Sequence, residues 1–190
     1  MDPDRVVSEV LDADAIASRV SELGTAIAAD YRGRRPLLVA VMTGALWFLS
    51  DLVRAIDGHL EVDFLMLTRF GEGGRIRIST DTASPLTGRH VILVEDVVDT
   101  GLSLTVLRRM ILDREPSSLA TVTLIDKVTR RLVDVPLEYR GFEVGDEYLV
   151  GYGLDHKGRY RNVGGIWAVL DLEEFSRDAD LLARLAYPPT

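Results

Sequence analysis

The sequence predicts an α/β fold with one mostly parallel central sheet flanked by helices. Apolar runs of four to seven residues are the first observation, and such runs are typical of strands buried on both faces. They occupy residues 37–41, 62–67, 91–94 and 119–125. Amphipathic helical patterns between some of these runs are the second observation. Strands that alternate with helices of this length predict right-handed βαβ units and a parallel sheet covered on both sides.

The first helix is predicted over residues 14–29, with Asp12 or Asp14 as its cap and Gly33 as its stop. Its apolar side chains recur at helical spacing and predict one buried stripe. They are Ile16, Val20, Leu23 and Ile27. After the strand at 37–41, Met42-Thr43-Gly44 predicts a tight turn into a second helix. The apolar face of that helix contains Ala45, Leu49, Leu52, Val53 and Ile56.

The rest of the chain continues the alternation in shorter pieces. The segment 70–75 has three glycines, which predicts a mobile loop. The strand at 91–94 precedes a third helix, whose predicted apolar face contains Leu102, Val106, Leu107, Met110 and Ile111. We expect further strands at 148–150 and 166–170, and one terminal helix over 172–185.

Composition predicts a single domain over residues 1–190, since 47% of the residues are apolar. The chain has 30 acidic and 22 basic residues, and its net charge of −8 argues against nucleic acid or an anionic membrane as the main partner. It contains no cysteine, which fits a reducing compartment such as the cytoplasm. Neither a signal peptide nor an apolar run long enough to cross a bilayer is evident.

An acidic loop is expected between the strand at 91–94 and the third helix. The carboxyl ends of neighbouring parallel strands open onto one crevice, so this loop and the turn after residue 41 should share it. Three carboxylates, Glu95, Asp96 and Asp99, precede Thr100-Gly101 and Ser103. The free N–H groups of a helix start, together with two hydroxyl groups, can bind a phosphate.

Carboxylates beside a phosphate repel it, so their presence needs another cause. A divalent metal or the hydroxyl groups of a sugar would supply one. The alternative is that Asp99 or Thr100 merely caps the helix, while Glu95 and Asp96 lie exposed at a strand end. Judged singly, each residue fits both interpretations, whereas the whole segment after an apolar strand favours a phosphate site.

The segment Val91-Ile92-Leu93-Val94-Glu95-Asp96-Val97-Val98-Asp99-Thr100-Gly101 resembles the phosphoribosyl-pyrophosphate motif of type I phosphoribosyltransferases. Its Glu-Asp-x-x-Asp-Thr-Gly form is similar to that of the hypoxanthine and guanine enzymes. Further matches follow in the order of that family, and together they run from about residue 6 to 170. They are Leu124-Ile125-Asp126-Lys127, Arg130-Arg131, Tyr139-Arg140-Gly141-Phe142-Glu143, Val150-Gly151-Tyr152-Gly153-Leu154-Asp155 and Tyr160-Arg161-Asn162. The resemblance implies a core at about 35–127 and a small hood formed by the N-terminal segment and about 140–175.

The resemblance implies a role for each matching residue. Glu95 and Asp96 would hold the ribose hydroxyls, and Asp99 would be the acid or base at purine N7. Six residues would surround the 5′-phosphate, namely Val98, Asp99, Thr100, Gly101, Leu102 and Ser103. Thr43, Gly44 and Arg161 would contact pyrophosphate. Magnesium would associate with Glu95, Asp96 and Asp155.

On the base side, Lys127 would donate to the exocyclic oxygen of the base, which favours a 6-oxopurine over adenine. Tyr148 would stack on the purine, the Leu149 backbone would contact its edge, and Asp155 would lie beside it. Each residue also has an ordinary interpretation when taken alone. Lys127 would then extend from a strand end to solvent, Tyr148 would be a core aromatic, and Asp155 and Arg161 would be surface charges.

The implied reaction transfers the phosphoribosyl group from phosphoribosyl pyrophosphate to hypoxanthine, or also to guanine, in purine salvage. It yields IMP or GMP and pyrophosphate, uses Mg²⁺, and takes place in a homodimer or homotetramer. The loop at 71–74 would be the lid. Two positions depart from the family pattern, because Thr43 replaces a lysine and Arg69-Phe70 replaces a Ser-Tyr pair. The alternatives are a xanthine or pyrimidine enzyme of the same fold, or a regulatory relative that binds RNA.

Overall fold

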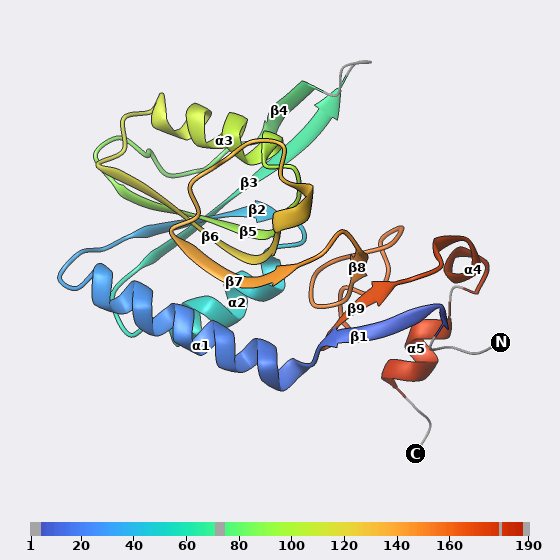
Figure 1. Ribbon diagram of the computed structural model, residues 1–190. Coiled ribbons are helices and arrows are strands. Elements are labelled where there is room, and N and C mark those ends of the chain that lie inside the picture. The colour runs from blue at the N-terminus through green and yellow to red at the C-terminus, as the bar shows by residue number, and fades with distance from the viewer. Residues whose placement is uncertain (1–4, 71–74, 179, 188–190) are drawn as a thin grey trace.

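A computed structural model describes residues 5–70, 75–178 and 180–187, and it is built on a six-stranded sheet (Figure 1). The strand order is β4-β3-β2-β5-β6-β7. Neighbouring strands are parallel except for β3 and β4, which are antiparallel. The strands are β2 (Leu37–Met42), β3 (Glu61–Phe70), β4 (Arg75–Thr80), β5 (His90–Val98), β6 (Ser118–Lys127) and β7 (Tyr139–Val144). The predicted α/β class with a mostly parallel sheet is confirmed.

Helices cover both faces of this sheet. Helices α1 (Ala13–Asp30) and α2 (Leu46–Ala55) lie together on one face, and α3 (Leu102–Leu112) lies on the other (Figure 1). Asp12 caps α1 as predicted, since its Oδ1 accepts a hydrogen bond from Ala15 N at 2.7 Å. Strand β2 alternates between the two layers: Leu38 packs with the α1 and α2 side chains, and Val39 packs with those of α3. This alternation explains why the strand is a continuous apolar run.

A second, three-stranded antiparallel sheet stands beside the first one (Figure 1). It contains β1 (Val7–Leu11), β9 (Ile166–Val169) and β8 (Tyr148–Val150), in that order. Two short helices, α4 (Leu172–Arg177) and α5 (Leu181–Ala186), contribute Phe175, Leu181 and Leu182 to its own buried cluster. No helix in the described ranges is both long and apolar enough to span a membrane.

The single terminal helix predicted over 172–185 is wrong, because the chain forms α4 and α5 instead. Asp178 lies at the break with φ −113° and ψ 84°, outside the helical region. Its Oδ1 accepts a hydrogen bond from Asp180 N at 3.2 Å. An aspartate that binds nearby backbone N–H groups competes with the helical hydrogen bonds, and the helix therefore stops here.

Three strands were not predicted as strands, namely β1, β4 and β7. Their burial is incomplete, so they lack the apolar runs that mark the central strands. The apolar face of α3 was also assigned with a wrong phase. Leu104, Leu107 and Ile111 are buried, whereas Leu102 and Val106 are 48% and 43% exposed.

Candidate active site

The residues predicted to form the site gather at the carboxyl edge of the large sheet, where β2, β5 and β6 end. Strand β5 is longer than predicted, so Glu95 to Val98 belong to the strand and not to a loop. Glu95 is paired in register with Thr123, and Val98 with Asp126 on β6. The carboxylates at 95 and 96 are therefore fixed by the sheet, whereas Asp99 begins the turn that leads into α3.

Glu95 and Asp96 form an acidic pair, in which Glu95 is buried and Asp96 is half-buried. The Glu95 side chain has no hydrogen bond or ion pair within the described part of the chain. Burial, reinforced by the Asp96 charge, raises the pKa of Glu95 well above its usual value. Burial also raises the pKa of Asp96 to about 6, although the Val97 N–H bond and the nearby Arg161 charge oppose that rise. A cation or hydroxyl donors brought by a ligand would stabilise both charges.

Gly44 lies directly against Asp96. A Cβ atom added to Gly44 would lie 1.6 Å from Asp96 Oδ2, so only glycine leaves room for that carboxylate. The preceding Met42–Thr43 peptide bond is cis, and Thr43 is exposed. The turn after β2 and the end of β5 thus form one surface, as the sequence predicted from strand order.

The turn from Asp99 to Ser103 leads into α3. Gly101 is the N-cap residue in the left-handed conformation, with φ 81°, and no side chain accepts a hydrogen bond as a cap. Thr100 Oγ1 lies 3.4 Å from Leu102 N, a long contact. The Thr100 hydroxyl thus lies at the N-terminus of α3, and the phosphate-binding role of these residues stays a prediction.

The segment that contains Leu132 and Val133 is hydrogen-bonded to this turn. Thr100 O accepts hydrogen bonds from Leu132 N at 3.0 Å and from Val133 N at 3.3 Å. Val133 O leaves no room for a side chain at Gly101, because it would lie 2.9 Å from an added Cβ. The segment follows the short helix η2 (Val128–Arg130) at the end of β6.

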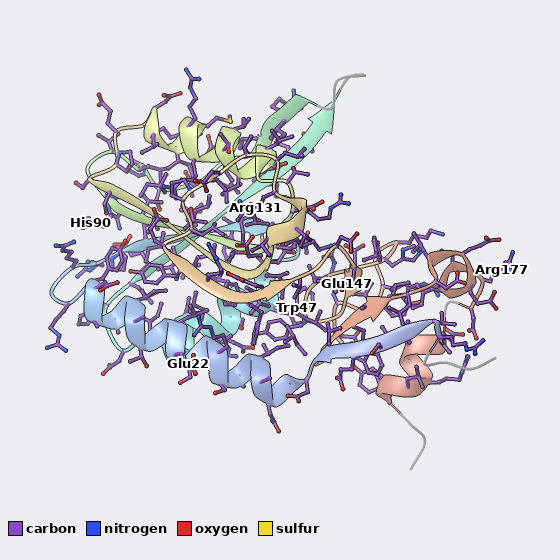
Figure 2. All side chains as sticks on the ribbon, viewed as in Figure 1. Glu22, Trp47, His90, Arg131, Glu147 and Arg177 are labelled. Atoms are coloured by element: carbon purple, nitrogen blue, oxygen red, sulfur yellow. The ribbon has the colours of Figure 1, made fainter. Side chains whose placement is uncertain are left out.

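Asp126 holds the segment that contains Leu132 and Val133 in place through Arg131, a role that was not predicted from the sequence. Its side chain is buried. The carboxylate accepts a hydrogen bond from Arg131 Nε at 2.8 Å and forms an ion pair with Arg140 Nε at 3.0 Å. These residues line a cavity of about 320 Å³, and Arg131 is labelled in Figure 2. A lone acid in the apolar run of β6 was the available signal, because a buried carboxylate needs a cationic partner.

Asp99, the predicted acid or base, is half-exposed and already paired. Its Oδ1 lies 2.7 Å from Arg130 Nε. Arg130 belongs to the short helix that follows Lys127, so β6 supplies both the partner of Asp99 and the predicted purine contact. Asp99 and Lys127 also interact electrostatically. The structure therefore brings the predicted catalytic and base-binding residues together.

The Lys127 ammonium donates a hydrogen bond to Glu147 O, in the segment between β7 and β8 (Figure 2). Burial lowers the pKa of Lys127. Tyr148, the next residue along, keeps 40% of its surface exposed, and its hydroxyl lies 3.1 Å from Asp155 O and 3.2 Å from His156 Nδ1. Leu149 is buried in the core, and the predicted contact of its backbone with the base stays a prediction.

Asp155 and Arg161 form an ion pair, with Arg161 Nη2 at 2.7 Å from Asp155 Oδ1. Arg161 also donates to Gly153 O, and Gly153, with φ 94°, abuts Gly44 O. Both charged groups act electrostatically on Asp96. The second sheet and its loops therefore reach the turn after β2, and Trp47 lies at this junction (Figure 2).

Within the described ranges, no group of three or more histidine or acidic side chains could hold a metal ion by itself. Glu95, Asp96 and Asp155 are thus not a complete metal site, and their metal role stays a prediction. The segment 71–74, predicted as a lid, and the side chains of Arg69 and Phe70 lie outside the described residues.

Comparison with known families agrees with this arrangement. The phosphoribosyl transferase domain family matches residues 6–157. The hypoxanthine-guanine phosphoribosyltransferase of Streptococcus pneumoniae is 40% identical over 167 residues, which cover 86% of this chain and 92% of that protein. The hypoxanthine phosphoribosyltransferase of Haemophilus influenzae is 38% identical over 175 residues, with 88% and 97% coverage.

Solved structures give the same result. The hypoxanthine phosphoribosyltransferase of Staphylococcus aureus superimposes with a TM-score of 0.85 at 33% identity, covering 90% of this chain and 95% of that one. The hypoxanthine-guanine enzyme of Bacillus anthracis gives 0.83 at 34% identity, with 86% and 99% coverage. The chain therefore belongs to the phosphoribosyl transferase family, and its fold is that of the hypoxanthine phosphoribosyltransferases.

Proposed function

We propose that this protein transfers the 5-phosphoribosyl group from phosphoribosyl pyrophosphate to a 6-oxopurine in purine salvage. Hypoxanthine is the first candidate base and guanine the second, and the products would be IMP or GMP with pyrophosphate. One observation carries the proposal: Asp99 and Lys127 meet at one sheet edge beside the N-terminus of α3. Groups suited to a phosphate, a sugar and an oxo-base would thus lie near one another, and the relatives reported above are named as enzymes with this activity.

The sugar-phosphate would occupy the end of β5 and the start of α3. The 5′-phosphate would accept hydrogen bonds from the α3 N–H groups and the Thr100 and Ser103 hydroxyls, around Val98, Gly101 and Leu102. Glu95 and Asp96 would accept hydrogen bonds from the ribose hydroxyls. Their burial beside each other supports this role, because two donor hydroxyls relieve the repulsion between the carboxylates.

The same carboxylates fit Mg²⁺. This ion usually takes one or two protein carboxylates and completes its octahedral shell with water and substrate oxygens. The described residues offer such an incomplete donor set, with Glu95, Asp96 and the nearby Asp155, and no closed cage. When bound, Mg²⁺ would supply positive charge for the pyrophosphate group.

The base would lie between Lys127 and Tyr148. A lysine ammonium has three N–H donors, and Glu147 O takes one of them, so two remain for the exocyclic oxygen of a purine. The exposed face of Tyr148 would stack on the base, with the Leu149 backbone and Asp155 at its edge. Adenine carries an amino group at that position, and a donor facing a donor disfavours it.

Charge develops at two places as the bond to pyrophosphate breaks. The sugar becomes cationic, which the carboxylates of Glu95, Asp96 and Asp99 would stabilise. The leaving pyrophosphate gains negative charge, which Arg161 and the backbone of Thr43 and Gly44 would stabilise. Asp99 would accept or hold the proton at purine N7; its half-exposed position lets a ligand reach it, and N7 would take the place of Arg130 as the partner of one carboxylate oxygen.

A panel of bases tests the proposal. The protein is mixed with phosphoribosyl pyrophosphate, Mg²⁺ and one base at a time: hypoxanthine, guanine, xanthine, adenine or uracil. We expect nucleotide from hypoxanthine, and little or none from adenine and uracil. The absence of product from every 6-oxopurine would refute the proposal. Product from xanthine or uracil alone would assign the protein to another specificity within the same fold.

We also propose a homodimer or homotetramer. Three apolar side chains, Val62, Phe64 and Met66, alternate along β3, and each is about 40% exposed. A stripe of this kind on one sheet face suits burial against a second copy. Sedimentation velocity of the wild type and of Phe64→Glu would test it, with dissociation expected in the variant. A monomeric wild type would contradict it.

Three further predictions concern the whole chain. We propose a core at about 35–127 and a hood formed by the N-terminal segment and about 140–175, with the hood beginning after β7, because Tyr139–Val144 pairs with β6 in the large sheet. We retain residues 71–74 as the lid. The lack of cysteine supports action in the cytoplasm, and the net charge of −8 supports the absence of a membrane or nucleic-acid partner.

A further inference from the structure

A second cavity lies at the opposite edge of the large sheet from the candidate active site. It has a volume of about 700 Å³ and is formed where α1 and α2 end and the chain turns into β2 and β3. Figure 1 shows this end of α1 far from β8 and the loops after it. Tyr31, which lines the cavity, contacts His90 edge-on at 6.2 Å between ring centroids, and His90 marks this end of the molecule in Figure 2. None of the predicted site residues lines it.

The rim of this cavity is cationic. Arg32, Arg34 and Arg35 line it together with His59, whereas Asp57 is its single acidic residue. All three arginines are exposed, and within the described ranges none of them forms an ion pair. Most other described arginines are paired with a carboxylate, as expected in a chain with excess acid. The cavity is therefore a local exception to the net charge of −8.

The nearby helix C-termini explain the presence of some of these positive charges. The C-termini of α1 and α2 both border the cavity, and a cation near a helix C-terminus is stabilising. However, α2 already has Arg54 in its last turn, and one further arginine would be enough to stabilise the C-terminus of α1. Three guanidinium groups within four residues repel one another, and an anion bound among them would relieve this repulsion.

The floor of the cavity is apolar and open. Ala28, Ala29, Pro36, Ala55 and Ile56 line it, and around Gly33 and Gly58 no atom would come within 4 Å of an added Cβ. Guanidinium groups bind phosphate oxygens in paired hydrogen bonds, and pockets for small ligands combine an apolar lining with a few polar groups. We propose that this cavity, the Arg32–Arg35 pocket, binds a ligand that carries a chain of two or more phosphates. The ligand would be a nucleoside polyphosphate or an inorganic polyphosphate, and the site does not depend on the transfer reaction.

NMR titration of the ¹⁵N-labelled full chain tests this proposal. The probes are sodium tripolyphosphate and ATP, each added in EDTA at constant ionic strength. We expect the amide signals of Gly33 and Gly58 to shift saturably. The Gly101 and Gly153 signals report binding at the candidate active site separately. Equal affinities for the two probes would assign the site to the phosphate chain alone, and tighter ATP binding would add a contact of the base with the apolar floor.

The triple variant R32Q/R34Q/R35Q should weaken binding at Gly33 and Gly58 by about tenfold or more, since one hydrogen bond to a charged group already contributes about that factor. Arg109→Gln, another exposed arginine, is the matched control and should leave the affinity unchanged. If the triple variant does not fold, Arg34→Gln alone should weaken binding measurably. The proposal is overturned if the Gly33 and Gly58 signals do not shift, if the variants bind as the wild type does, or if a single-stranded RNA oligonucleotide binds more tightly than both probes.

Discussion

The two halves of the candidate active site hold their charges differently. In the sugar-phosphate half, at the end of β5, the buried Glu95 and the half-buried Asp96 have no cation in direct contact among the described residues. In the base half, charged groups already have partners within the protein: Lys127 donates one hydrogen bond to Glu147 O, and Asp155 pairs with Arg161 at 2.7 Å.

Because of this difference, we expect the two halves to contribute differently to stability and to ligand binding. Buried carboxylates that repel each other lower the stability of the empty protein and bind donors or a cation strongly once these arrive. Groups that already have partners lower the stability of the empty protein little, and they exchange one partner for another when a ligand binds. We therefore expect changes in the sugar-phosphate half to affect turnover or stability, and changes in the base half to affect the choice and affinity of the base.

The largest effect is expected for Asp99→Asn. An amide cannot accept the proton at purine N7, so turnover should fall by about a thousandfold, within the usual range for general acid–base catalysis. The affinity for phosphoribosyl pyrophosphate, measured by calorimetry, should be unchanged. Asp113→Asn, at the other end of α3, is the control and should have normal turnover. A fully active Asp99→Asn enzyme would remove Asp99 from its role.

Gly44→Ala should lower kcat/KM by about a hundredfold, because displacing a positioned group by about 1 Å costs about that much. The added Cβ would collide with Asp96 Oδ2, which lies 1.6 Å from its position. Gly58→Ala is a matched control, since nothing lies within 4 Å of its Cβ. Steady-state kinetics of both variants measure this effect. Equal kcat/KM values for the two variants would show that Asp96 moves aside without loss of activity.

Asp96 should also make stability depend on pH. Its pKa is raised from 3.8 to about 6 by burial, so the folded protein holds this proton more tightly than the unfolded chain does. Its contribution to the free energy of unfolding should be most favourable below about pH 4, fall between about pH 4 and 6, and stay level above that. Asp96 is partly exposed, and solvent screening leaves a difference of about 2 kcal/mol.

Urea unfolding of the metal-free protein in EDTA at pH 4 and pH 7 measures this effect. Asp96→Asn should reduce this decline and be more stable than the wild type at pH 7, while losing activity; the part that remains is expected from Glu95, whose pKa burial also raises. Asp113→Asn should keep the wild-type pH dependence. A wild type whose stability rises from pH 4 to 7 by the same amount as that of Asp96→Asn would contradict the prediction.

Lys127→Gln tests the base half and should give the smallest change. The variant loses one charge-assisted hydrogen bond to the base, so the KM for hypoxanthine should rise about tenfold while kcat changes little. Adenine should become a better substrate relative to hypoxanthine, since the amide oxygen of glutamine accepts a hydrogen bond from an amino group. Unchanged discrimination between the two bases would show that Lys127 does not read the exocyclic group.

The sequence by itself determined the central strands and the sugar-phosphate half of the site. Both are local patterns, because the burial of β2 and β5 on two faces requires apolar runs, and Glu95 to Ser103 run from the end of β5 into α3 without interruption. The family resemblance supplied Lys127, Tyr148 and Arg161, which spacing alone did not distinguish from ordinary surface or core residues. The strands β1, β4 and β7 gave no such signal, since they are only partly buried.

Tertiary structure alone decided how distant residues meet. It placed Asp96 over Gly44, Gly153 against Gly44 O, and Arg130 on Asp99. It also revealed the buried Asp126 with its two arginines and the Arg32–Arg35 pocket at the opposite edge. These contacts join segments far apart in the chain, and their geometry depends on how sheets and helices pack, which no local pattern of residues specifies.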